Sequence, residues 1–182
     1  RGEKFNKDVY REMLKDPKVV AIGECGLDYY RCDIEYVENQ KRAFIEQIEL
    51  ANEFNKPLML HIRNNQKKEL IEGVEGKPNA YVDALDLLKK YSKVKRELRG
   101  DVHFFAGNTE EAKAFTDFGF SLSFTGVITF TNDYDDVIKN TPLDMIMSEP
   151  DDLYVTPTPI RGKRNDQFHV RDGGRKIGIV TG

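Results

Sequence analysis

Four side chains that can bind a divalent metal ion each follow a short apolar stretch of the chain. They are Glu24, His61, His103 and Asp151. Carboxylate and imidazole groups together suit magnesium, manganese or zinc, so the set favours a hard or borderline cation without naming it. Such an ion lowers the pKa of a bound water and neutralises charge on phosphoryl oxygens, which are the two requirements of phosphodiester hydrolysis. The pattern therefore predicts a site for one or two divalent ions, with Glu24 bridging them if there are two.

Each of these residues also has an explanation that involves no metal. A single His61 or His103 after a strand, taken alone, is more often a hydrogen-bonded core residue than a ligand. Glu24 could cap a helix or pair with Arg31, and Asp151 could be a turn residue. Four such residues at equivalent strand ends reverse these odds, so we favour the metal site.

The elements that must position the four residues alternate between strand and helix. Apolar runs predict strands, apolar residues at helical spacing predict helices, and their alternation favours crossover units and a parallel sheet. In a closed parallel barrel, strand ends of one polarity share one face, which would bring the four ligands together. Thr109 is the expected N-cap of the last predicted helix. The predicted strands are residues 19–23, 57–62, 101–105, 120–124 and 143–148, and the predicted helices are 5–14, 35–55, 81–91 and 109–119.

Length, composition and charge narrow the class of protein. The 182 residues, of which 39% are apolar, can bury one sizeable core, so we expect a single domain over residues 1–182. Residues 64–79 are expected to form a surface excursion, and residues 166–182 an irregular tail. The net charge of -3 argues against binding duplex DNA through a broad positive surface. No apolar stretch approaches the roughly 20 residues of a membrane span and no cationic leader opens the chain, so we expect a soluble protein without membrane contact. The two cysteines do not suggest a disulfide framework, so a reducing, cytoplasmic setting is the simplest inference.

Basic side chains near the predicted metal site suit an anionic substrate. Arg63 lies two residues past His61, hence on the same side of an extended strand, and its planar fork fits a phosphate. Arg161, Lys163 and Arg164 form a basic cluster further along the chain. A solvated charge run is an equal alternative for this cluster, and phosphate contact is the functional interpretation.

A loop is expected after Glu24 because glycine, aspartate and tyrosine follow it, and this loop contains Gly26, Asp28, Tyr29 and Tyr30. Tyrosines at the mouth of a site can stack on unpaired bases, although covering the rim of a barrel is their more frequent role. Asp28 is expected to orient a metal ligand or a neighbouring arginine.

Five blocks of sequence, in the same order, resemble the TatD-type metal-dependent deoxyribonucleases. The resemblance implies a (β/α)8 barrel of the TIM type, hydrolysis of phosphodiester bonds with a divalent metal, and DNA as the usual substrate class. It also implies exonuclease action on single strands, which would make single-stranded DNA the partner. The blocks are Ala21–Tyr30, Pro57–Arg63, His103–Gly107, Glu149–Asp151 with Thr156–Pro157, and Arg161–Asn165.

The resemblance also implies a role for each matching residue. Glu24 would be the shared metal ligand, and His61 and His103 would complete one metal position. Asp151 would hold the attacking water as the catalytic residue and touch the other metal. Glu149 would occupy a supporting position beside the ligands.

The chain also departs from the pattern of this family. The family opens with a His-x-His pair at the end of its first strand, whereas the only histidines here are His61, His103 and His169. About three strands before Val19 and a closing helix after the block that ends at Asn165 are missing by the same comparison. We therefore expect an incomplete barrel of about five of the eight strands, with a missing N-terminal segment or a partner chain completing it.

Three functions are compatible with these residues. The leading one is a metal-dependent deoxyribonuclease, and the second is a related barrel hydrolase that acts on a C–N or ester bond. The third is a truncated, catalytically impaired or non-catalytic relative that keeps the scaffold. The arginine and lysine side chains favour phosphate, whereas the absent His-x-His pair favours the third function.

Overall fold

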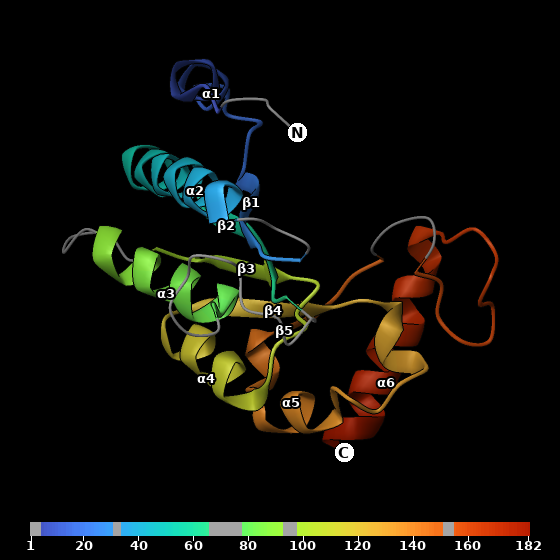
Figure 1. The fold of residues 1–182 in the computed structure, drawn as a ribbon. Coiled ribbons are helices and arrows are strands. Elements are labelled where there is room, and N and C mark those ends of the chain that lie inside the picture. The colour runs from blue at the N-terminus through green and yellow to red at the C-terminus, as the bar shows by residue number, and fades with distance from the viewer. Residues whose placement is uncertain (1–4, 31–33, 66–77, 93–97, 151–154) are drawn as a thin grey trace. The chain divides into compact units, whose positions relative to one another are not determined.

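The computed structural model describes residues 5–30, 34–65, 78–92, 98–150 and 155–182 (Figure 1). Asp151, Arg31 and most of the predicted surface excursion lie outside these residues. By its contacts the chain divides into two compact units, residues 1–101 and 102–182, and the division falls inside the third strand.

In the described ranges, five strands form one sheet in which spatial order follows chain order, β1-β2-β3-β4-β5. The pairs β1/β2 and β4/β5 are parallel, and helices occur between successive strands, as the predicted crossover units require. The α/β class with parallel strands is therefore confirmed. The strands are β1 Ile22–Asp28, β2 Leu58–Arg63, β3 Gly100–His103, β4 Phe120–Phe124 and β5 Ile146–Ser148.

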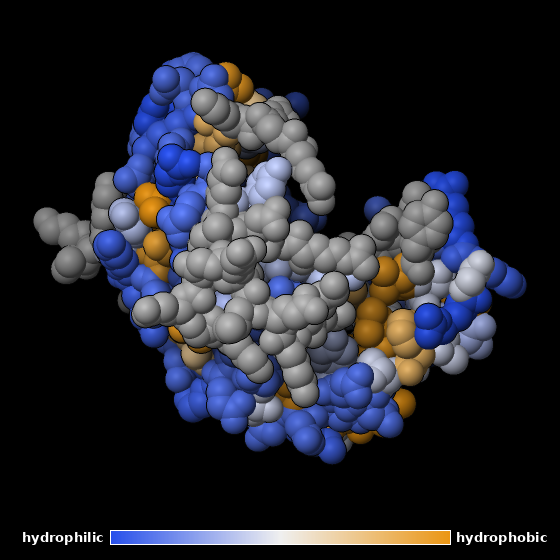
Figure 2. Space-filling model, in the orientation of Figure 1, coloured by the Kyte–Doolittle hydropathy of each residue, from blue (hydrophilic) through white to orange (hydrophobic). Residues whose placement is uncertain are grey.

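The first unit packs three helices against or beside β1 and β2. They are α1 Lys7–Met13, α2 Ile34–Phe54 and α3 Ala80–Tyr91. Contacts join α2 to β1 and α3 to both strands, and fully buried side chains such as Phe44 and Leu60 fill the space between them. Figure 2 shows mostly hydrophilic residues on the outer side of these helices, as expected for helices that turn one face to a core.

The second unit contains β4, β5 and the remaining helices. Its core is rich in phenylalanine, and the rings of Phe115 and Phe120 meet edge to face at 6.2 Å between centroids. A capping box at Asn108 begins α4, so Asn108 is the N-cap and the prediction of Thr109 is one residue late. The helices are α4 Thr109–Asp117, η1 Gly126–Thr129, α5 Asp135–Asn140, η2 Leu143–Met145, η3 Gln167–His169 and α6 Val170–Thr181. No helix among the described residues is long and apolar enough to cross a membrane.

One predicted ligand lies at a different point of its strand than the sequence suggests. Glu24 lies within β1 and not past a strand that ends at residue 23, whereas His61 lies within β2, as the predicted strand 57–62 requires. The pairing of these strands shifts between Ile22 and Cys25 and then continues. Gly26 has φ +135° and a Cβ there would lie 2.3 Å from the carbonyl oxygen of His61, so only glycine fits this approach. The glycines that suggest a loop therefore belong to the strand.

The C-terminal segment is also different from its prediction. Residues 166–182 are expected to be irregular, but they contain η3 and the helix α6, so a helix does follow the Arg161–Asn165 block. The pair Gly173-Gly174 suggests a turn, whereas Gly173 is buried within α6. A Cβ at this position would lie 2.5 Å from the Ser148 hydroxyl oxygen, so a larger residue does not fit. Gly173 thus permits close packing of α6 on β5, and Ile177 fills the core on the same helix.

The last predicted strand is shorter than its apolar pattern. Residues 143–148 are expected to be a strand, but Leu143–Met145 form the short helix η2 and only Ile146–Ser148 pair with β4. Pro142 precedes η2, and its carbonyl oxygen accepts the Met145 backbone N–H at 2.9 Å, which closes a turn before the strand begins.

Candidate metal centre

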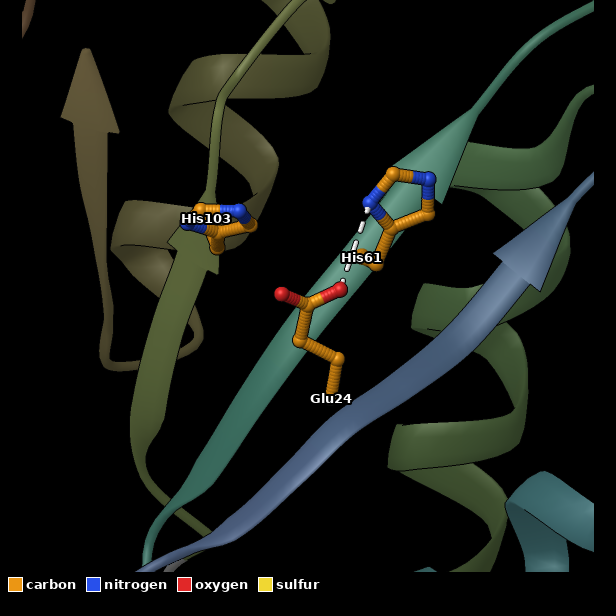
Figure 3. A group of neighbouring side chains, drawn as sticks. All are labelled: Glu24, His61 and His103. Atoms are coloured by element: carbon orange, nitrogen blue, oxygen red, sulfur yellow. Dashed lines mark ion pairs between the residues drawn. The ribbon is translucent and has the colours of Figure 1, made fainter. Parts of the chain in front are cut away.

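Glu24 and His61 face each other from neighbouring strands of the first unit. Glu24 Oε2 lies 3.9 Å from His61 Nδ1, and the dashed line in Figure 3 marks this pair. The Glu24 side chain is 54% exposed and that of His61 36%, so both can be reached from solvent. The second ring nitrogen of His61, Nε2, lies 3.6 Å from Asp28 Oδ2. His61 is therefore placed between two carboxylates.

Asp28 ends β1, where its side chain lies beside His61 and its backbone is paired with Arg63 of β2. Its Oδ1 accepts the Tyr30 backbone N–H at 2.8 Å. Burial alone would raise the pKa of Asp28, but interactions with His61, Tyr30 and Arg63 outweigh it and hold the pKa below its ordinary value. The guanidinium carbon of Arg63 lies 3.8 Å from the centroid of the Tyr30 ring. Arg63 is thus exposed but stacked, with its charge beside Asp28.

His103 and Glu149 form a tight pair in the second unit. His103 Nδ1 lies 2.7 Å from Glu149 Oε2, and the other oxygen accepts the Phe104 backbone N–H and the Ser123 hydroxyl, each at 2.8 Å. Burial would raise the pKa of Glu149, but these three donors outweigh it and lower the pKa. An ionised carboxylate only accepts hydrogen bonds, so Nδ1 is the nitrogen of His103 that donates to Glu149. In the neutral form of the ring this leaves the lone pair that a metal needs on Nε2.

Within the part of the chain that the structure describes, three potential ligands lie together, namely Glu24, His61 and His103 (Figure 3). Each offers one ligand atom, and the three atoms lie within 4.8 Å of one another. One carboxylate and two imidazoles are a donor set that zinc or manganese accepts, so these residues fit a divalent ion. Asp151, the fourth predicted ligand, lies outside the described residues, and its role stays a prediction.

The basic cluster of the second unit lies on a well-bonded segment. Arg161, Lys163 and Arg164 are all exposed. The Thr156 hydroxyl donates to the Lys163 carbonyl oxygen at 2.6 Å, and the guanidinium carbon of Arg161 lies 3.6 Å from the centroid of the Phe130 ring. The three basic side chains are therefore exposed on a segment that contacts within the unit stabilise. Phosphate binding by these side chains stays a prediction.

Sequence reasoning missed the polar partners that hold these side chains. The sequence pattern indicates only that Ser123 lies in a strand, yet its hydroxyl donates a hydrogen bond to Glu149, which lies 26 residues further along the chain. Gln40, in the second turn of a predicted helix, binds the backbone of Asp28. No local signal identifies either residue, because each contact depends on which elements pack together.

Comparison with known proteins places these blocks in one family. The family model of TatD-related DNases matches residues 2–179. An uncharacterized metal-dependent hydrolase, YcfH of Escherichia coli K12, is 32% identical over 184 aligned positions, which cover 100% of this chain and 63% of YcfH. A TATDN1 homolog of Vairimorpha ceranae, whose name assigns it provisionally to the deoxyribonucleases, is 32% identical and is matched over 80% of this chain and 47% of its own length. The chain thus spans less than two thirds of these relatives.

A solved structure extends the similarity to the fold. The crystal structure of YjjV, a TatD homolog from Escherichia coli K12, matches with a TM-score of 0.78 and 24% sequence identity over 96% of this chain and 61% of YjjV. At this identity the likeness concerns the fold alone. It agrees with the predicted barrel type, of which the described residues form five strands.

Proposed function

The chain belongs to the family of TatD-related DNases, and from this membership we propose that it hydrolyses phosphodiester bonds of DNA with the help of a divalent metal ion. The finer proposal is exonuclease action on single-stranded DNA. The observation that carries the proposal of metal-dependent hydrolysis is the grouping of Glu24, His61 and His103 on the neighbouring strands β1, β2 and β3. The name of YcfH, a metal-dependent hydrolase, supports a hydrolytic reaction and leaves the substrate to experiment.

Each residue of the proposed centre has a separate task. Glu24, His61 and His103 would hold an ion of magnesium, manganese or zinc, which supplies polarisation of a phosphoryl oxygen and a more acidic water when bound. Glu149 keeps the proton of His103 on Nδ1 and so leaves Nε2 for ligation. Asp151 is proposed to hold the attacking water and, if there are two ions, to contact the second.

Exposed arginine and lysine side chains support phosphate as the group that is bound. Arg63 is exposed at the end of β2, in the same strand as His61, and its stack on Tyr30 limits the orientations of its guanidinium. Because a guanidinium binds two phosphoryl oxygens with a fixed geometry, this placement suits a phosphodiester. Arg161, Lys163 and Arg164 are proposed to bind further phosphates of the same strand.

The direct test is hydrolysis of a labelled single-stranded oligonucleotide by the purified chain. We expect shortened products with Mn²⁺ or Mg²⁺, none after treatment with EDTA, and recovery when the metal is returned. A 5′ label and a 3′ label in separate reactions report the direction of digestion, and a circular single strand distinguishes exonuclease from endonuclease action. An RNA oligonucleotide of the same sequence tests the preference for DNA.

Two other outcomes of this test correspond to the alternative functions. Metal-dependent cleavage of ester or amide substrates without cleavage of DNA would replace the nuclease proposal by a barrel hydrolase of C–N or ester bonds. If the chain binds metal but hydrolyses DNA no faster than an Asp151→Asn variant, it is a non-catalytic relative. Cytoplasmic location, and completion of the barrel by further chain or a partner, remain proposals that stand apart from this assay.

Replacement of Arg63 by alanine is expected to raise KM for DNA about 10-fold while kcat changes by less than about 2-fold. One lost phosphate contact of about 1.4 kcal/mol, made equally in the bound substrate and the transition state, produces this split. Steady-state kinetics with the oligonucleotide measure it. The KM of Arg63→Lys should lie between those of the original chain and Arg63→Ala, because lysine keeps the positive charge but lacks the planar guanidinium that binds two oxygens. Arg42→Ala on the exposed side of α2 is the control, and an Arg63→Ala enzyme with unchanged KM would remove Arg63 from the substrate site.

A further inference from the structure

We propose that Gln40 of α2 is a positioning residue of the metal centre, which acts by holding Asp28 against His61. This inference rests on the proposed function, because it assigns a support to one of the proposed ligands. It depends only on contacts within the first unit.

Gln40 binds the backbone of Asp28 through both ends of its side-chain amide. The Asp28 backbone N–H donates to Gln40 Oε1 at 2.6 Å, and Gln40 Nε2 donates to the Asp28 carbonyl oxygen at 2.8 Å. This pair of bonds has the pattern that a neighbouring strand would provide. The opposite side of β1 is paired with β2, where Asp28 faces Arg63. Asp28 is thus held from two sides.

The next residue is held just as firmly. The Tyr29 backbone N–H donates to the Arg63 carbonyl oxygen at 2.8 Å, and its buried hydroxyl donates to Asp83 at 2.6 Å. Lys41, the neighbour of Gln40 in the sequence, pairs with the same Asp83 at 2.8 Å. Two consecutive residues of α2 therefore stabilise two consecutive residues at the end of β1.

The held backbone sets the position of one carboxylate. Asp28 Oδ1 accepts the Tyr30 N–H, and Oδ2 lies 3.6 Å from His61 Nε2. The other ring nitrogen of His61 lies on the side of Glu24. A carboxylate beside one nitrogen of a histidine fixes the ring orientation and favours ligation through the other, and loss of such a support costs about 10- to 100-fold in metal affinity or activity. Gln40 would thus contribute to the site without touching an ion or a substrate.

A purely structural role for Gln40 would have a different signature. Packing of α2 on β1 is provided by apolar residues such as Phe44 and Ile48, whereas Gln40 is only partly buried. If Gln40 merely satisfies two backbone groups at the edge of β1, its loss lowers stability and leaves the His61 ring where it is. If it positions Asp28, its loss moves the ring and weakens metal binding at unchanged folding.

The test compares Gln40→Met with Gln47→Met, the same substitution two turns further along α2. Methionine keeps the length of the side chain and removes both hydrogen bonds. The first readout needs no metal, because it is the position of the His61 Cε1–Hε1 cross-peak in a ¹H–¹³C spectrum, which is simple in a chain of three histidines. The second is the Mn²⁺ affinity by titration calorimetry. We expect Gln40→Met to shift the cross-peak and weaken Mn²⁺ binding about 10-fold, and Gln47→Met to do neither.

A double substitution decides whether Gln40 acts through Asp28. Asp28→Asn should shift the His61 cross-peak as Gln40→Met does, and the double variant should bind Mn²⁺ no more weakly than Asp28→Asn alone. An unmoved His61 cross-peak in folded Gln40→Met, or fully additive losses in the double variant, would overturn the positioning role. If the unsubstituted chain binds no Mn²⁺, the proposed metal function fails, while the cross-peak still decides the role of Gln40.

Discussion

Replacing Glu24 by glutamine is expected to lower metal-dependent hydrolysis of DNA by at least about 100-fold. The substitution keeps the shape of the side chain and removes the one negative charge among Glu24, His61 and His103. A neutral amide oxygen is a much weaker ligand for a divalent ion, and electrostatic stabilisation by that ion contributes several kcal/mol to the reaction. The rate with saturating Mn²⁺ and labelled single-stranded DNA measures the loss.

Stability should not change with this substitution, which makes the result easy to interpret. The Glu24 side chain is 54% exposed, so its charge is not part of the core. Glu38→Gln, an exposed position on α2, removes a charge of the same kind away from the centre and should leave the rate unchanged. Thermal unfolding of both variants without metal should match that of the original chain. A Glu24→Gln variant that keeps half of the original activity would exclude Glu24 as a ligand.

The helices and strands of this chain were largely predictable because their signals are local. The long helix α2 differs from its predicted range by one residue at each end. Errors occurred where tertiary packing decides what a glycine does. Gly26 suggests a loop but accommodates the backbone of β2, and Gly173 suggests a turn but accommodates Ser148. A single sequence shows where a glycine is present, but it does not show whether a turn or a close neighbour in the fold requires that glycine.

The same distinction separates the ligands of the candidate centre from their supports. Glu24, His61 and His103 are identifiable as a set because acidic and imidazole groups recur after apolar runs along the chain and together have a definite chemistry. Gln40 and Ser123 have no such signal, since a glutamine in a helix or a serine in a strand is ordinary. Their roles arise from the packing of α2 on β1 and from the pairing of β4 with β5. A pattern of residue types does not show which distant elements pack together, so it does not predict these contacts.

Glu149→Gln is expected to weaken Mn²⁺ binding by about 10- to 100-fold through the proton of His103. The Phe104 N–H and the Ser123 hydroxyl both need an acceptor, so the single oxygen of the glutamine turns toward them. Its NH₂ group then faces His103 and donates to Nδ1, which moves the ring proton to Nε2. The nitrogen that should bind the metal would then carry hydrogen. Titration calorimetry measures the affinity, and long-range ¹H–¹⁵N spectra report the tautomer.

Ser123→Ala separates this effect from simple loss of stability. It removes one donor to Glu149 but leaves the bond between Glu149 and His103, so the tautomer and the Mn²⁺ affinity should persist. Both variants should lose about 1–3 kcal/mol of unfolding free energy, because each disturbs a buried hydrogen bond to a charged group. Equal stability losses with unequal metal affinities would therefore show that Glu149 acts on the ring proton of His103. Equal metal affinities in the two variants would mean that Glu149 holds β3 near β5 and nothing more.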